Sequence, residues 1–277
     1  MSALAAAYGE VGKLPAFVRR DFLIALSYRT AFAGDIVFLG AQMVVFSFIG
    51  RLVDPAALPS YGGSATSYME FVAIGIVLSL VVGVLLGRVA TAVRQEQLQG
   101  TLEALLATPA AVATVQVGSV AFDLLWVPVR MVLFLAVISL GFGLDLDLAA
   151  VPKAAVLMIA FLPFVWGLGL LSAAGILAFR RGGGATGFVI SFLGIASGAY
   201  FPLSLLPGWL EAVGRVNPFA QALEGMREAL LGGAGWGAVA ADAAALVPPS
   251  AVLLLAGAAA FRLALARERR NGTLGLY

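Results

Sequence analysis

The side chains that could do chemistry in this sequence are carboxylates and arginines, because the chain contains no His and no Cys. Their absence excludes disulfides, thiol nucleophiles, zinc or haem sites built on Cys or His, and Ser-His or Cys-His catalysis. Membrane proteases of the Ser/His and HExxH kinds are excluded with them. We therefore expect no catalytic residues and no metal site, and ask what the few charged side chains do instead.

The most informative carboxylates, Glu96 and Glu103, lie in the segment 94–109, RQEQLQGTLEALLATP. Gly100 can take the left-handed conformation that ends a helix, and Thr101 can cap the next one. Glu103 then falls in a first helical turn, where negative charge is favoured. Pro109, after a threonine, suits the start of a further helix.

This spacing predicts a six-residue helix over 102–107, within a short loop at 91–110. The helix would present a small apolar surface beside the two carboxylates, made by Leu102, Leu105 and Leu106. An apolar knob next to negative charge suits the groove of a partner protein. The alternative is an ordinary capped connection between two helices.

Two further charges, Asp123 and Arg130, stand inside an apolar stretch. Seven residues of helix place them on one face, about 10 Å apart along the axis. Charges at membrane depth usually face a bundle interior or a wet cavity. One interpretation is a substrate contact or gating ion pair. The other is a structural pair that holds this helix to its neighbours, through Asp35.

The composition indicates an all-α membrane protein. Hydrophobic residues make up 61% of the chain and charged residues 12%, whereas soluble domains carry about 25% charged residues. Its mean hydropathy is +1.01. A bilayer-crossing helix needs roughly 20 predominantly apolar residues. Six stretches qualify, at about 31–53, 68–90, 111–142, 152–179, 185–206 and 243–266.

The positive charges orient these spans. With the N-terminus inside, twelve of the seventeen basic residues fall on the cytoplasmic side, four outside and Arg130 within a span. This distribution follows the positive-inside rule and predicts that both termini are cytoplasmic. The spans form one domain, 31–266, between an N-terminal segment, 1–30, and a tail, 267–277.

Short helices flank the spans. Residues 14–30 have an apolar side and a basic side, which is typical of a helix lying on a membrane surface. The external segment 207–242 contains Asn217-Pro218, an N-cap followed by a first-turn proline. We expect helices near 207–215 and 218–231 there, as a re-entrant element, a lid or a folded cap.

The pattern Glu96-x-x-x-Gly100-Thr101-Leu102-Glu103-x-Leu105-Leu106-x-Thr108-Pro109 resembles the signature loop of the ABC transporter type-two permeases, and most closely that of the daunorubicin-type drug permeases. The tail Gly272-Thr273-Leu274 is similar to the family's C-terminus. The segment before the last span also resembles the family, through Pro202, Pro207, Asn217, Pro218, Glu224 and Arg227.

This resemblance implies a permease that pairs with a second copy of itself and with two cytoplasmic ATPase subunits. The helix 102–107 would be the coupling helix, and the segment containing Glu224 and Arg227 an external gate. The chain has no GxxxxGK[ST] motif, so ATP and Mg²⁺ would bind to the partner ATPase. The expected location is the plasma membrane of a bacterium or archaeon, with lipids and no nucleic acid as further partners.

The expected activity is ATP-driven export of a drug or another amphipathic, lipid-like molecule, with a glycan as a further candidate. One alternative is a secondary transporter or channel that needs no ATPase, which would favour broken helices and more intramembrane acids. Another is a membrane scaffold in an ABC-like complex.

Overall fold

The computed structural model describes residues 14–27, 29–62, 66–98, 112–179, 188 and 191–271. Within these ranges the fold is helical, and no β-strand occurs. Five described helices are long and apolar enough to cross a membrane. They are α3 (Arg29–Gly50), α4 (Tyr68–Leu98), α6 (Val112–Phe142), α7 (Val151–Phe179) and α11 (Trp236–Asn271). The predicted all-α membrane fold class is thereby confirmed.

The fifth predicted span, 185–206, differs most from the structure. Its described part is helical at 188 and 191–195 and then turns at 196–200. Gly198 has a φ of 72° in this turn, a conformation that commonly ends a helix. The helix therefore ends well before residue 206. Because most of 180–190 lies outside the described residues, the count of six spans stays a prediction.

Two other helices extend beyond their predicted ends. Helix α4 continues past residue 90 to Leu98, so Glu96 belongs to this helix. The sequence from 89 to 98 contains no Gly or Pro, and seven of its ten residues are Ala, Arg, Gln, Glu or Leu, so most of it favours a helix. Helix α11 begins at Trp236 rather than near 243. The predicted coupling helix, 102–107, lies outside the described residues.

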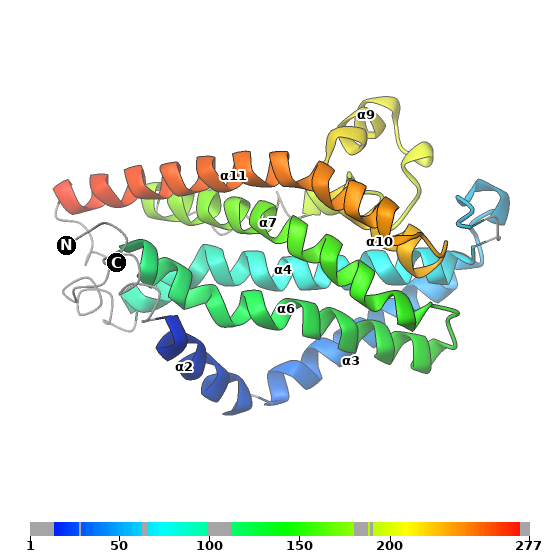
Figure 1. Ribbon diagram of the computed structural model, residues 1–277, viewed down its shortest axis with the longest axis horizontal. Helices are drawn as coiled ribbons and strands as arrows, with labels where there is room; N and C mark the ends of the chain where they lie inside the picture. The colour runs from blue at the N-terminus through cyan, green and yellow to red at the C-terminus, as the bar shows by residue number, and fades with distance from the viewer. Residues whose placement is uncertain are drawn as a thin grey trace.

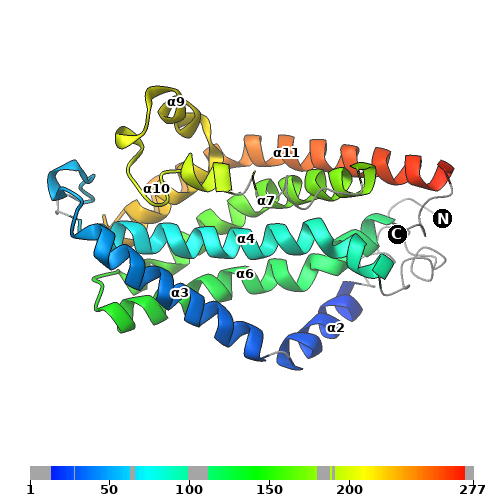
Figure 2. The ribbon, with the colours of Figure 1, turned by 180° about the vertical axis from the view of Figure 1, so that it is seen from behind.

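The long helices run roughly along one axis, as Figure 1 shows. The beginning of α2 (Leu14–Ser27) and the end of α11 lie toward one end of the molecule. We call the opposite end, with residues 51–62, 143–150 and 203–235, the distal end. Seen from behind, α3 crosses obliquely in front of α4 and α6 (Figure 2).

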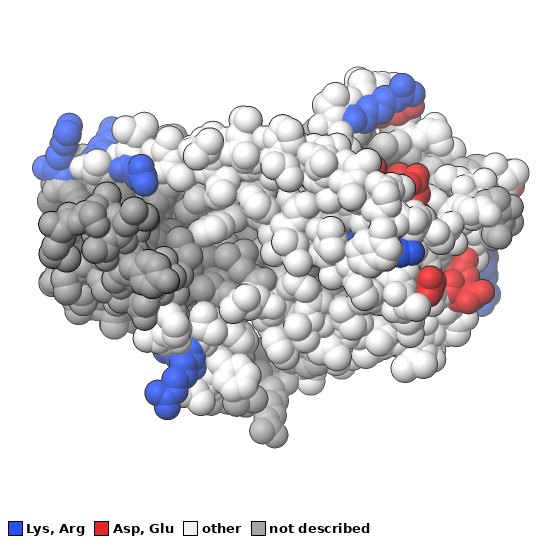
Figure 3. Space-filling model, viewed as in Figure 1, with Lys and Arg blue, Asp and Glu red and all other residues white. Residues whose placement is uncertain are grey.

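Helix α2 packs on α6, where Phe22 meets Phe122 edge to face with their ring centroids 6.1 Å apart. Its place at the membrane surface stays a prediction. On the face drawn in Figure 3, charged side chains of the described residues gather toward the two ends and leave an uncharged middle. Such a band is what a helix bundle presents to lipid tails.

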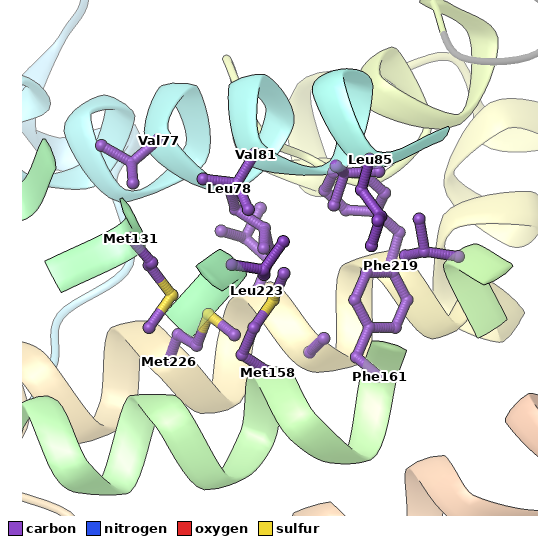
Figure 4. Close-up of a cluster of buried hydrophobic side chains, with 14 of the residues drawn as sticks. Val77, Leu78, Val81, Leu85, Met131, Met158, Phe161, Phe219, Leu223 and Met226 are labelled. Carbon is purple, nitrogen blue, oxygen red and sulfur yellow. The ribbon is translucent and has the colours of Figure 1, made fainter. Parts of the chain in front are cut away.

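Two short helices follow the turn at 196–200. Helix α9 (Gly208–Val216) and the 3-10 turn Leu203–Leu205 form a lobe at the side of the bundle, which we call the α9 lobe (Figure 1). Helix α10 (Pro218–Leu230) instead enters the core. Figure 4 shows Phe219, Leu223 and Met226 among side chains of α4, α6 and α7. This short helix thus lies inside the distal half of the bundle.

Glycines allow α7 and α11 to pack backbone against backbone. A Cβ added at Gly167 would lie 2.5 Å from the carbonyl carbon of Leu253, and one at Gly257 would overlap the carbonyl oxygen of Gly167. The Ser250 hydroxyl donates across the same interface to the Ala160 carbonyl at 3.2 Å. Small residues and interhelical hydrogen bonds are what hold helices together in lipid, where the hydrophobic effect between helices is absent.

Replacing Gly167 by Val should force α7 and α11 apart and lower the free energy of unfolding by about 1–3 kcal/mol. An SDS titration in mixed micelles measures this quantity. The control is Gly141→Val in α6, because no atom lies within 4 Å of the Cβ that it would add. Equal destabilisation by the two substitutions would contradict the packing argument.

Candidate functional site

The distal end is organised around one buried cation. Arg227 lies on the core side of α10 and is only 2% exposed. Its Nε and Nη2 atoms donate to the Phe71 carbonyl at 3.2 and 3.1 Å. Nη2 also donates to the carbonyls of Gly198 and Ala199, at 3.0 and 3.3 Å. The guanidinium thus ties α10 to the start of α4 and to the turn at 196–200.

These bonds have a clear physical cause. A helix that stops inside a bundle leaves its last carbonyls without helical partners, and a buried unpaired carbonyl is costly. The turn at 196–200 is such a place, and the fork of Arg227 supplies the donors. Gly75 lets α4 approach closely, because a Cβ there would overlap the Ala199 carbonyl oxygen.

Two further contacts stabilise the charge of Arg227. Its Cζ atom lies 3.5 Å from the ring centroid of Phe71, a close cation–π contact. Its Nη1 atom lies 3.7 Å from a carboxylate oxygen of Glu224, three residues earlier in α10. The Tyr61 hydroxyl donates to both oxygens of Glu224, at 2.8 and 3.0 Å. We call Tyr61, Phe71, Glu224 and Arg227 the distal cluster.

Tyr61 acts in this cluster as a neutral donor. Burial raises the pKa of its phenol far above the usual range, and the neighbouring Glu224 carboxylate raises it further, against the opposing effect of Arg227. The hydroxyl therefore keeps its proton at physiological pH. Tyr61 belongs to the connection between α3 and α4, so the cluster joins this connection to α10 as well.

The other predicted gate residues position α9 and α10. The Asn217 side chain accepts from the backbone N–H of Phe219 at 3.0 Å and donates to the Leu193 carbonyl at 3.3 Å. Pro218 is the first residue of α10, as its type predicts. Pro202 precedes the 3-10 turn and Pro207 precedes α9. The structure thus gathers the predicted segment around one turn, although its role as a gate stays a prediction.

The predicted intramembrane charges have a different setting. The Arg130 guanidinium lies 4.0 Å from the Asp35 carboxylate, which links α6 to α3. Both side chains are partly buried, and the Nε atom of Arg130 has no hydrogen-bond partner among the described residues. Asp123 belongs to α6, but its side chain lies outside the description. The Arg130–Asp35 contact links the third predicted span to the first, and both proposed roles of Asp123 and Arg130 stay predictions.

A cavity of about 540 Å³ lies beside α4, between α3 and the segment 191–200. We call it the central cavity, because its α4 residues, Ser79, Leu80, Gly83 and Val84, fall in the middle of the span Tyr68–Val89. No charged side chain is among the described residues that line it. The Ser79 Oγ is buried without a partner among those residues.

A protein-family model for the ABC-2 type transporter matches residues 14–231. The chain belongs to the ABC-2 type transporter family. A comparison with curated proteins found no match. This ABC-2 chain is accordingly a multi-pass membrane protein and the permease subunit of an ABC transporter. The match supports a role in transport rather than catalysis.

In this ABC-2 chain, the sequence interpretation found Glu224 and Arg227 but missed Tyr61 and Phe71. No local signal identifies these two aromatic residues, because each is ordinary for its helix or loop. Of the predicted coupling residues, Glu96 lies in α4, although its side chain is not described. The rest lie outside the described residues: Gly100, Thr101, Leu102, Glu103, Leu105, Leu106 and Pro109.

Replacing Arg227 by Met should lower the free energy of unfolding by about 3–5 kcal/mol, because the carbonyls of Gly198 and Ala199 lose their bonds to the guanidinium and the Glu224 carboxylate loses its counter-charge. Arg227→Lys should recover only part of this loss, since an ammonium lacks the planar fork. SDS titration of each purified variant measures the effect, with the exposed Arg262→Met as control. If Arg227→Met lowers the free energy of unfolding no more than Arg262→Met does, the buried hydrogen bonds of Arg227 do not stabilise the distal end.

Proposed function

We propose that this permease subunit exports a drug or another amphipathic, lipid-like molecule from the cytoplasm or inner leaflet, with energy from a separate ATPase. The central cavity is the observation that carries the proposal. Its walls are mainly apolar, and the lining residues with polar side-chain groups are Gln42, Ser79, Ser191 and Tyr200. Such a lining suits an uncharged amphipathic surface better than an ion.

The cavity is open at the side of α3 and of the segment 191–195, where Phe38 and Ile195 are exposed. A substrate dissolved in the bilayer would therefore have lateral access. A second copy of the chain packed on this side would close the cavity. These features support a homodimer, as the sequence resemblance implies.

Helix α4 supports the proposed coupling. One helix lines the cavity at Ser79–Val84, continues through Glu96 and ends at Leu98, four residues before the predicted coupling helix 102–107. A displacement of Gly100–Pro109 by a partner ATPase would be transmitted along a continuous helix to the cavity wall. At its other end, α4 is held by Arg227 through Phe71. This connection supports our proposal that the distal cluster acts as the external gate.

The proposed orientation follows the basic residues. Arg262, Arg267 and Arg270 lie on the last turns of α11, at the end where α2 begins. The positive-inside rule places this end in the cytoplasm and the distal end outside. The proposed location is the plasma membrane of a bacterium or archaeon, and ATP and Mg²⁺ would bind to the partner ATPase.

The cavity is tested by filling it. A side chain at Gly83 would enter open space, since no atom lies within 4 Å of its added Cβ. Gly83→Leu should therefore leave folding and assembly intact. With an uncharged amphipathic compound that the unaltered permease exports from proteoliposomes, it should reduce ATP-driven export about tenfold, the effect of losing 1–2 kcal/mol of binding free energy. The control is Gly40→Leu, which also adds its Cβ to open space but does not line the cavity. Equal export by both variants would reject the cavity as the path.

The coupling is tested at the loop. Replacing Glu103 and Leu105 together by Ala should remove both the charge and the apolar contact of the predicted coupling helix. We expect the copurified ATPase to keep its own hydrolysis while ATP-driven export is lost, because the mechanical link is broken. Asp145→Ala combined with Leu140→Ala supplies a matched double substitution at exposed positions that lie away from the loop and line neither cavity. A permease that never copurifies with an ATPase, or a loop variant with unchanged export, would contradict the proposal.

A further inference from the structure

A second cavity, of about 420 Å³, lies beneath the α9 lobe at the distal end. We call it the lobe pocket. Its walls are α10 on one side and the α9 lobe on the other, with Arg227 and Gly198 among its lining residues. It shares no lining residue with the central cavity. Its volume falls within the range of small-molecule sites, about 300–1,000 Å³.

The α9 lobe is held in place over this pocket. A Cβ at Gly214 of α9 would lie 2.6 Å from Leu203 Cδ2 and 2.8 Å from the Ala196 carbonyl oxygen, so the helix packs directly on the turn. Asn217, between α9 and α10, is buried and bonded to the Leu193 carbonyl. The pocket is therefore part of the packed fold rather than a gap under a loose segment.

The lobe pocket presents both signs of charge. Arg215 of α9 has a side chain that is 73% exposed, and it bonds Glu211 at 2.7 Å. A guanidinium carries five N–H donors, so this bond leaves donors for a ligand. Glu224 of α10 is 48% exposed and accepts from Tyr61. A carboxylate has about four acceptor positions, so it too retains capacity.

Uncharged polar groups complete the lining. Gln221 lies on α10 three residues before Glu224, and Ser197 and Ser204 face the pocket from the turn and the lobe. Arg215 and Glu211 balance each other, as do Arg227 and Glu224. A ligand with one net charge would upset this balance. A ligand with one positive and one negative group preserves it.

The α9 lobe and the residues before it carry exposed apolar side chains. On the α9 lobe, Trp209 is 65% exposed and Val216 is 75% exposed. Leu205 of the lobe and Phe201, which precedes it in the chain, are exposed as well. In a membrane protein, Trp is enriched at the level of the lipid head groups, with its ring toward the acyl chains. These side chains place the lobe, and the pocket under it, at that level of the bilayer.

We propose that the lobe pocket binds the head group of a zwitterionic phospholipid. The phosphate lies against Arg215 and Gln221, the ammonium group lies against Glu224, and the acyl chains run along the exposed apolar side chains of the lobe. Phosphate with guanidinium and ammonium with carboxylate are charge-assisted pairs, the stronger class of hydrogen bond. This inference does not rest on the export proposal, because it concerns a different cavity and needs no ATPase.

The experiment uses the full chain, purified and delipidated in detergent. Native mass spectrometry follows the titration of palmitoyl-oleoyl phosphatidylethanolamine, with phosphatidylglycerol of the same chains as the lipid lacking an amine. Glu224→Gln and Arg215→Gln should each weaken binding of the first lipid about tenfold, the value of one hydrogen bond to a charged group. Arg262→Gln, at the far end of α11, should leave it unchanged.

Arg215→Gln keeps the test independent of folding, because Arg215 is exposed and bonds only within α9 in the contacts that the structure describes. Equal affinity for the two lipids, or binding unchanged in both variants, would overturn the proposal. Soluble glycerophosphoethanolamine should bind much more weakly than the lipid. If it binds equally well, the ligand is a soluble zwitterion and the membrane source is rejected.

A second copy of the chain is the other possible cover for the lobe. The absence of native cysteines allows Trp209→Cys to be used as a clean probe. Efficient disulfide formation between two copies at this position in liposomes would show that the lobe faces a partner chain and would overturn the lipid assignment. Labelling by a lipid-soluble maleimide, without cross-linking, is the expected result.

Discussion

The fork of Arg227 on the carbonyls of Phe71, Gly198 and Ala199 is the constraint on which the distal half of this protein depends. It stabilises a chain reversal inside the bundle, where buried carbonyls without a donor are costly. Once the reversal is stabilised, α10 can occupy the core and the α9 lobe can stand beside the bundle. Glu224 lies beside the same cation and accepts a hydrogen bond from Tyr61. Arg227 therefore joins α10 to the start of α4, to the turn at 196–200 and, through Glu224, to the connection between α3 and α4.

Helix α4 connects the distal cluster to the other end of the protein. With 31 residues it is about 46 Å long, longer than the roughly 30 Å hydrocarbon core of a bilayer. It begins at the distal cluster, lines the central cavity and ends at the edge of the predicted coupling segment. A rigid element of this length would make the position of the cavity wall sensitive to events at both membrane surfaces.

The two cavities differ in chemistry because they differ in depth. The central cavity lies at the middle of a span and is lined by apolar and uncharged polar side chains. The lobe pocket lies at the distal end, where Arg215 and Glu224 are partly exposed. Uncompensated charge is costly near the bilayer centre and inexpensive near its surface. The Arg130–Asp35 contact, with both side chains partly buried, is paired as this rule requires.

The sequence alone was enough to predict the membrane class and the start of α10 at Asn217-Pro218. It also predicted both ends of α3, α6 and α7, and the start of α4, to within a few residues. These features depend on local composition and capping, which act over one or two turns. The end of the helix at Ile195 and the joining of Arg227 to Phe71, 156 residues away in the chain, were decided by tertiary structure. A carbonyl acquires its partner only when distant segments pack together, and no local pattern contains that information.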